Sequence, residues 1–199
     1  MSESLDVNVA LGPRSYHISV VSHQFDRFAE TLETWMSQSP AYHNAIQEGH
    51  KTAFIVTDRN LSKLHTPHIE KSLTARGWKW ETAIIEPGEK SKSLPVISEL
   101  YDRLVAMKAD RQTVLIAVGG GVTGDAGGFV AATYVRGLPF VQVPTSLLAH
   151  VDSSVGGKVG VNHSQAKNLI GAFYQPVGVF IDTSTLETLP ERDYRSGLA

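Results

Sequence analysis

The chain has 199 residues, 42% of them hydrophobic and 19% charged, and its 18 Lys and Arg residues against 20 Asp and Glu residues give a formal net charge of -2. This balance excludes a global basic field that would recruit nucleic acid or a membrane, so any anion site must be local. The absence of cysteine excludes disulfides, thiolate metal ligands and a cysteine nucleophile, and without a secretory signal or an apolar run of about 18 residues we expect a cytoplasmic protein.

The N-terminal part predicts a β-hairpin followed by a helix. Apolar residues alternate over residues 7–11 and again over residues 16–20, with a Gly-Pro pair between the two runs. Apolar residues then recur at helical spacing over residues 25–36, where Ser22 is available as the N-cap and a Ser-Pro pair ends the helix. Residues 41–50 are polar and favour neither structure.

The rest of the chain alternates between strands and helices. Residues 52–57 form a short apolar run rich in β-branched residues, which indicates a strand buried on both faces of a parallel sheet. The further expected elements are a helix at 66–77, a strand at 78–85, a helix at 94–107, a strand at 113–118, a helix at 122–134, and strands at 140–143 and 177–181. This order predicts an α/β fold with a Rossmann-like, mainly parallel sheet, flanking helices and the N-terminal hairpin.

The last residues predict one more helix. Pro190 is placed at its first turn, and the sequence ERDYRSGLA then stops without a terminating turn. We therefore expect this chain to be part of a longer protein.

A glycine-rich segment follows the strand predicted at 113–118. Gly119, Gly121 and Gly124 match the pattern G-x-G-x-x-G, at the point where an apolar strand leads into a helix. Such glycines allow the backbone to approach a pyrophosphate, which the N-terminus of the helix then stabilises. The alternative is that the small residues only permit close packing of the helix on the strand.

The carboxylate that binds a ribose hydroxyl in dinucleotide sites does not follow at the usual spacing of about 20 residues, because the strand at 140–143 ends at Pro144. Asp58, which is followed by Asn60, also lies at the end of a predicted strand. The carboxyl ends of parallel strands meet in one crevice, so Asp58 can take this role although it comes earlier in the chain. The alternative is that residues 58–60 form a simple turn.

A second polar group lies among serines and glycines. Asp152, Lys158 and Lys167 are suited to holding a phosphate or carboxylate, with backbone N–H groups as further donors. The alternative is that these three residues lie in a solvated loop. Asp125 lies one residue after the glycine pattern, in the first turn of the predicted helix, and the alternative to a binding role is a favourable interaction of its carboxylate with the helix dipole. The histidines show no spacing typical of metal ligands, so we expect no complete metal site within these residues.

At these residues the chain resembles the 3-dehydroquinate synthases, which are members of the sugar-phosphate cyclase superfamily. The matching segments are GGGVTGDAGGFVAATYVRG, VPTSLLAHVDSSVGGKVGVN, KNLIGAFYQP and TLPERDYRSGLA. They cover about the last 85 residues closely, and TDRN and PGEKSKS extend a weaker match upstream. Four ordered motifs are far more specific than one glycine loop.

The resemblance implies an enzyme of the shikimate pathway that converts DAHP, a seven-carbon sugar acid phosphate, to 3-dehydroquinate. In this reaction bound NAD oxidises a hydroxyl transiently, phosphate is eliminated, the ketone is reduced again and the ring closes by an aldol step, while a divalent metal, zinc or cobalt, polarises the reacting oxygens. The resemblance also implies an NAD-binding α/β domain at residues 1–183 and the beginning of an α-helical metal and substrate domain at residues 184–199.

Roles for single residues follow from the same resemblance. Adenosine-side contacts are expected at Asp58, Asn60, Glu89 and Lys92. Contacts with the pyrophosphate are expected at Gly120, Gly121, Val122 and Asp125, and further cofactor contacts at Thr145, Ser146, Leu148, Thr188 and Leu189. Positions at the nicotinamide and the substrate are Asp152, Lys158, Lys167 and Asn168. Arg136 matches an arginine that reaches the phosphate of the neighbouring subunit's substrate, which implies a homodimer.

In the family, GLA is followed at once by a glutamate that ligates the metal, and two histidine ligands lie further on. This chain ends at Ala199, so we expect it to be inactive alone. Three other interpretations stay open: another sugar-phosphate cyclase, an NAD domain like that of the iron-type alcohol and glycerol dehydrogenases, and a non-catalytic nucleotide-binding module.

Overall fold

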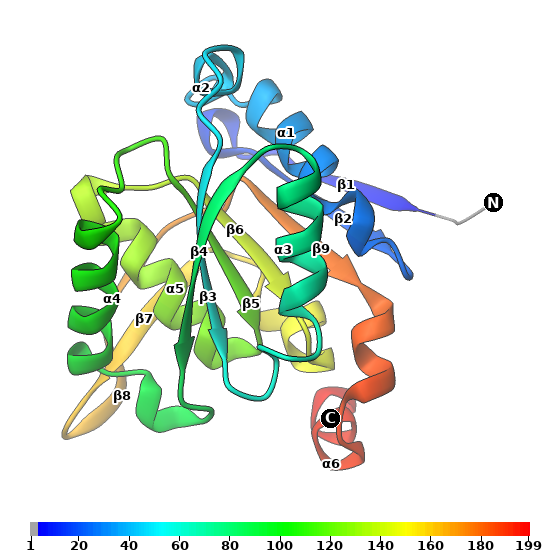
Figure 1. Cartoon of the computed structure of the whole chain (residues 1–199). Coiled ribbons are helices and arrows are strands. Elements are labelled where there is room, and N and C mark those ends of the chain that lie inside the picture. The colour runs from blue at the N-terminus through cyan, green and yellow to red at the C-terminus, as the bar shows by residue number, and fades with distance from the viewer. Residues whose placement is uncertain (1–3) are drawn as a thin grey trace.

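The computed structural model describes residues 4–199 as a seven-stranded sheet between two layers of helices, with a separate two-stranded hairpin (Figure 1). The strands are β1 (Leu5–Val9), β2 (Tyr16–Val21), β3 (Thr52–Asp58), β4 (Lys79–Ile85), β5 (Val114–Gly119), β6 (Phe140–Pro144), β7 (Lys158–His163), β8 (Ala166–Phe173) and β9 (Gly178–Asp182). The α-helices are α1 (Phe28–Gln38), α2 (His43–Gln47), α3 (Thr66–Ala75), α4 (Leu94–Ala106), α5 (Gly121–Thr133) and α6 (Glu191–Leu198). Short 3-10 helices are η1 (Gly12–Arg14), η2 (Phe25–Arg27), η3 (Glu89–Ser91), η4 (Tyr134–Arg136) and η6 (Thr183–Thr188), and η5 (Ala149–Ser153) is a π-helix.

The sheet has the order β1-β2-β9-β6-β5-β3-β4, and β1 pairs antiparallel with β2 while the other neighbours are parallel. The predicted Rossmann-like α/β fold with its N-terminal hairpin is therefore confirmed. In the register, Thr57 of β3 pairs with Val118, and Gly119 pairs with Pro144. The carboxyl ends of β3, β5 and β6 consequently lie side by side at one edge of the sheet.

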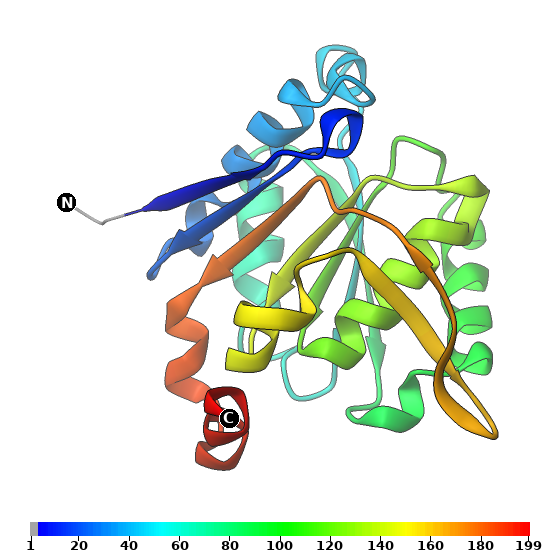
Figure 2. The same cartoon turned by 180° about the vertical axis from the view of Figure 1, so that it is seen from behind.

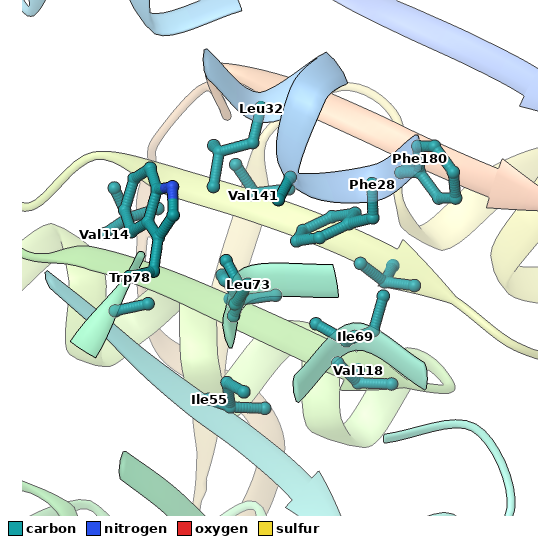
Figure 3. Close-up of a cluster of buried hydrophobic side chains, with 14 of the residues drawn as sticks. Phe28, Leu32, Ile55, Ile69, Leu73, Trp78, Val114, Val118, Val141 and Phe180 are labelled. Carbon is teal, nitrogen blue, oxygen red and sulfur yellow. The ribbon is translucent and has the colours of Figure 1, made fainter. Parts of the chain in front are cut away.

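One face of the sheet is covered by α1 and α3. Figure 3 shows Phe28 and Leu32 of α1 and Ile69 and Leu73 of α3 meeting strand residues such as Val141 in one buried cluster. These side chains are the apolar positions that recur at helical spacing, so burial of one stripe of each helix fixes it on the sheet.

The other face is covered by α4 and α5, and α5 is buried on two sides because the hairpin β7–β8 lies over it (Figure 2). A Cβ atom at Gly128 would come within 2.3 Å of Cγ1 of Val159 and 3.0 Å of Cε1 of Phe140. This explains why α5 is rich in glycine and alanine: larger side chains would hold it away from the hairpin and the sheet.

The hairpin itself is a departure from the sequence analysis, which assigned no strand to residues 158–173. In β7, Val159 and Val161 are buried against the α5 side, while Lys158 and His163 are exposed. The apolar face consists of few residues between charged and glycine positions, so the alternation of apolar and polar residues extends over too few positions to indicate a strand.

A second departure concerns the start of the first helical segment, where Ser22 makes no capping hydrogen bond. Instead the carboxylate of Asp182, at the end of β9, accepts hydrogen bonds from the backbone N–H groups of His23 at 2.8 Å and Gln24 at 2.7 Å. These bonds and those from Ser184 lower the pKa of Asp182, although burial opposes the shift. The cap therefore comes from a residue 158 positions away from Gln24.

The helix predicted after Pro190 is present as α6. Within residues 4–199, the structure contains no helix with both the length and the apolar character needed to cross a bilayer.

Candidate functional site

A cleft of about 400 Å³ opens at the edge of the sheet where the carboxyl ends of β3 and β5 meet. It is lined by seven of the residues that the sequence assigned to a cofactor: Asp58, Gly120, Gly121, Val122, Ser146, Leu148 and Leu189. They come from four separate segments, which only the parallel sheet brings together. The structure thus brings seven of the thirteen expected cofactor residues to one cleft, whereas six others do not line it: Asn60, Glu89, Lys92, Asp125, Thr145 and Thr188.

The four glycines between residues 119 and 124 have two different roles. A Cβ atom at Gly119 would lie 2.6 Å from Cβ of Thr123, and one at Gly124 would lie 2.8 Å from Oε1 of the buried Gln142. At Gly120 and Gly121 the nearest atoms would be serine hydroxyls at 3.5 and 3.2 Å. The packing explanation therefore applies to Gly119 and Gly124, whereas Gly120 and Gly121 leave space on the cleft side.

Helix α5 begins at this cleft. Gly120 occupies its N-cap position without a side-chain cap, and the first intrahelical bond runs from the N–H of Gly124 to the carbonyl of Gly120. The preceding N–H groups at the start of a helix have no intrahelical acceptor. Together with the helix dipole they form a site suited to an anion such as a phosphate.

Asp58 both forms a turn and lines the cleft, which are the two possibilities that the sequence left open. Its Oδ1 atom accepts hydrogen bonds from the backbone N–H groups of Asn60 at 2.8 Å and Leu61 at 3.1 Å, so residues 58–61 do form a turn. The half-buried side chain also lines the cleft, while Asn60 is exposed and does not. The turn fixes the carboxylate at the cleft, and the two interpretations are compatible.

Lys92 does not line this cleft, and only 6% of its side chain is exposed. Its Nζ atom donates to Oδ2 of Asp125 at 2.5 Å and also to Oδ1 of Asn168. Burial raises the pKa of Asp125, while the ammonium group of Lys92 acts in the opposite direction. Three residues that the sequence placed at different parts of a ligand are thereby joined in one network.

A second hollow of about 630 Å³ lies between α5, η5 and the hairpin. It is lined by Asp125, Asp152, Lys158 and Asn168, which are four of the expected cofactor and substrate positions, and by apolar residues of the hairpin. Ser153 lies on this hollow, and its hydroxyl group is the group nearest to the Cβ position of Gly121 in the first cleft. The two sites are therefore adjacent.

Other expected site residues lie around these two hollows. The backbone N–H of the buried Thr145 donates to the carbonyl of Gly119 at 3.1 Å, and Thr188 shares a hydrogen bond of 2.8 Å with Nε2 of His65. Lys167 is largely exposed, with its Nζ atom 3.9 Å from Oε1 of Glu89.

Arg136 is not brought to either hollow within the chain. It follows the far end of α5, and a helix of 13 residues spans about 20 Å. Its backbone has a φ of +69°, next to Val135 with a φ of +43°. Left-handed conformations are unfavourable for such residues and fix the direction in which the exposed arginine leaves the helix.

Two findings were outside the reach of the sequence analysis. The side chain of Asn162 bonds to Glu89 and to the backbone of Asn168, and no signal pointed to it because β7 had not been recognised. Asp193 and Ser196 of α6 also line the first cleft.

In the described part of the chain, residues 4–199, no group of three or more His, Asp or Glu side chains could hold a metal ion.

Comparisons with known proteins identify the family and the fold of this chain. A family profile described as 3-dehydroquinate synthase N-terminal matches residues 82–196. The chain is 50% identical over 193 residues to the 3-dehydroquinate synthase of Desulforamulus reducens, an alignment that covers 97% of this chain and 50% of that relative. The chain therefore spans about half the length of the curated relatives it matches.

Two solved structures have the same fold over nearly the whole chain. One is 2-deoxy-scyllo-inosose synthase complexed with carbaglucose-6-phosphate, NAD+ and Co2+, with a TM-score of 0.82 and 27% identity over 98% of this chain and 50% of that one. The other is 2-epi-5-epi-valiolone synthase from Streptomyces hygroscopicus with NAD+ and Zn2+ bound, with a TM-score of 0.76 and 26% identity over 96% and 49% of the two chains.

Proposed function

Because this chain belongs to the 3-dehydroquinate synthase family, we propose that it is the NAD-binding part of a 3-dehydroquinate synthase, an enzyme that converts DAHP to 3-dehydroquinate and phosphate. The observation that carries the proposal is the cleft at the end of the sheet, where Asp58 faces the glycines at the start of α5. A carboxylate opposite a helix N-terminus suits a ligand with a ribose at one end and a pyrophosphate at the other.

Several residues of the cleft support NAD as its ligand. Gly120 and Gly121 leave space for a pyrophosphate close to the backbone, and Ser146 supplies a hydroxyl group beside them. Leu148 and Leu189 provide apolar surface on the same cleft. When bound, NAD would supply a reversible hydride acceptor.

The second hollow is proposed as the site of the nicotinamide and the substrate. Lys158 and Asp152 line it as exposed groups, so a lysine is available for a substrate carboxylate or phosphate. Lys92 holds Asp125 and Asn168 at its wall. In this arrangement the first cleft binds the cofactor and the adjacent hollow orients the sugar phosphate.

The carboxylate of Asp58 is expected to make the site selective for NAD over NADP. A 2′-phosphate would meet a negative charge, so NADP should bind roughly 100-fold more weakly than NAD, and Asp58→Asn should reduce this preference to below about 10-fold. Asparagine retains an Oδ1 acceptor for the turn at residues 58–61, so the melting temperature serves as the control for folding. Calorimetric titration measures both affinities, and equal affinity of the unsubstituted chain for NAD and NADP would contradict the assignment.

The complete reaction is proposed for the longer enzyme rather than for these 199 residues. The resemblance places the metal ligands in the half of the relatives that this chain does not span, so the chain with DAHP, NAD and zinc is expected to release no phosphate above background. A coupled phosphate assay measures this directly. Sustained release by the pure chain would show that the half of the relatives that this chain does not span is unnecessary for the reaction.

Several further features belong to the same proposal. We place the domain boundary at residues 183 and 184, between the NAD-binding domain and the start of a helical domain that binds zinc or cobalt. We also propose a cytoplasmic homodimer. Arg136 supports the dimer, because it projects from the end of α5 away from both hollows and is available to a second subunit's substrate phosphate.

A further inference from the structure

Asn162, near the end of β7, forms three hydrogen bonds with segments on different sides of it. Its Nδ2 group donates to Oε1 of Glu89 at 2.7 Å, and its Oδ1 atom accepts from the backbone N–H of Asn168 at 2.9 Å. Its own backbone N–H donates to the carbonyl of Lys92 at 2.9 Å. One amide side chain therefore connects the loop around η3 with the second strand of the hairpin.

The position of Asn162 in the hairpin makes the contact with Asn168 unusual. The pairing of β7 with β8 changes register between Val161 and His163, so Asn162 lies at an irregularity where the strands do not exchange ordinary ladder bonds. Such bulges redirect side chains and occur next to active sites. Here the Oδ1 atom of Asn162 takes the place of a strand carbonyl as the acceptor for Asn168.

Asn168 depends on this bond because its backbone is left-handed, with a φ of +58°. Asparagine tolerates this conformation better than most residues, yet it still has to be held by its surroundings. Asn162 holds the backbone N–H and Lys92 holds Oδ1. The direction of the Asn168 side chain at the second hollow is consequently set by two residues outside it.

The contact with Glu89 provides the other half of the connection. Glu89 belongs to η3, the same short loop that leads to the buried Lys92. Any displacement of this loop by a bound adenosine would act on Asn162 through Oε1 of Glu89 and the carbonyl of Lys92. From there it would reach Asn168.

We propose that Asn162 is a positioning residue that couples the cofactor cleft to the substrate hollow, by holding Glu89 and the left-handed backbone of Asn168 with the two ends of one amide. This inference rests on the proposed function, since the resemblance places Glu89 at the cofactor. In the structure Glu89 directly follows Gly88, which lines the first cleft, and Glu89 itself lines a neighbouring hollow together with Lys92 and Asn162. The inference assigns a role to a residue that itself lines neither the first cleft nor the second hollow.

The test changes the nitrogen end of the Asn162 side-chain amide and keeps its oxygen end. Asn162→Asp keeps an acceptor for the N–H of Asn168 but places a carboxylate against Glu89, so NAD affinity should fall roughly 10-fold. Adding Glu89→Gln gives the new carboxylate a donor, and the double variant should bind NAD more tightly than Asn162→Asp although it carries one more substitution. A recovery of NAD affinity at an unchanged melting temperature would not follow from a role in folding alone.

Three measurements complete the design. The matched control Gln165→Glu makes the same amide-to-carboxylate change at the exposed turn of the hairpin and should leave NAD affinity within about 2-fold. Melting temperatures exclude unfolding as the cause. The amide resonance of Asn168 should shift on NAD addition in the unsubstituted chain, and this response should be lost in Asn162→Leu, which removes both side-chain bonds.

The outcomes separate this inference from the proposed function. If the unsubstituted chain binds NAD but Asn162→Asp binds it equally well, or if Glu89→Gln brings no recovery, the coupling is overturned while the cofactor site stands. If the folded, unsubstituted chain binds no NAD, the proposed function is overturned and the coupling with it.

Discussion

Replacing Lys92 by methionine is expected to lower the free energy of unfolding by about 3 kcal/mol and to abolish measurable NAD binding. Methionine has a similar shape but cannot neutralise the carboxylate of Asp125, whose side chain is 25% exposed, and leaving a charge without its partner in a largely buried position is among the most destabilising changes in proteins. Asn168 would lose the donor to its Oδ1 atom at the same time. Chemical denaturation and calorimetric titration measure the two effects, and Lys90→Met, at an exposed neighbour in η3, is the matched control.

Two further observations test whether the partly buried carboxylate of Asp125 is the cause. Adding Asp125→Asn to Lys92→Met should restore at least about half of the lost stability, because the partly buried charge is then removed altogether. In the single variant, burial keeps the pKa of Asp125 above its unfolded value with no lysine to oppose it. The loss of stability relative to the parent should therefore be smallest below about pH 4 and grow as the pH rises through the raised pKa of Asp125. A Lys92→Met variant as stable as the parent at pH 7 would contradict this account.

Replacing Gly120 by valine is expected to weaken NAD binding by about 100-fold or more with little loss of stability. The φ and ψ angles of Gly120, -79° and -169°, are extended and acceptable for valine. Within residues 4–199, and apart from the two neighbouring residues, the atom nearest to a Cβ there is the hydroxyl oxygen of Ser146 at 3.5 Å, so the side chain would occupy the cleft. It would thus hold a pyrophosphate away from the start of α5. The melting curve should indicate a change of about 1 kcal/mol at most.

Gly128→Ala, in the helix that follows Gly120, is expected to lower the stability of the chain without weakening NAD binding. Its Cβ atom would lie 2.3 Å from Cγ1 of Val159, so the free energy of unfolding should fall by about 2 kcal/mol, while the folded fraction binds NAD as before. Strong NAD binding by Gly120→Val would show that the ligand does not approach this backbone, and the cofactor assignment would then fail.

The sequence was sufficient for the parallel sheet, because each buried strand is a short continuous apolar run and each amphipathic helix has apolar residues at helical spacing. Residues 52–57 and the helix ending at the Ser-Pro pair are examples, and both are present. The hairpin β7–β8 was not predicted, because its buried face consists of few residues and its pairing is irregular near Asn162. Local patterns fail where a structure depends on a bulge or on packing against another element.

Some of the residues that line the site could be predicted from the sequence. The glycines and Asp58 could be expected at one crevice, since parallel strands end together. Which glycines serve packing could not, because the answer lies in Thr123 and in Gln142 from another strand. The burial of Lys92 was also invisible, since it occurs in the charged segment EKSKS and its partners Asp125 and Asn168 are distant in sequence.

The central claim is that NAD binds between Asp58 and the start of α5. A crystal structure of this chain grown with NAD tests it most directly. We expect the pyrophosphate within hydrogen-bonding distance of the backbone N–H groups at residues 120–122, a ribose hydroxyl on the carboxylate of Asp58, and the nicotinamide directed toward the hollow lined by Asp152 and Lys158. A dinucleotide bound elsewhere on the chain, with this cleft holding only water, would contradict the account.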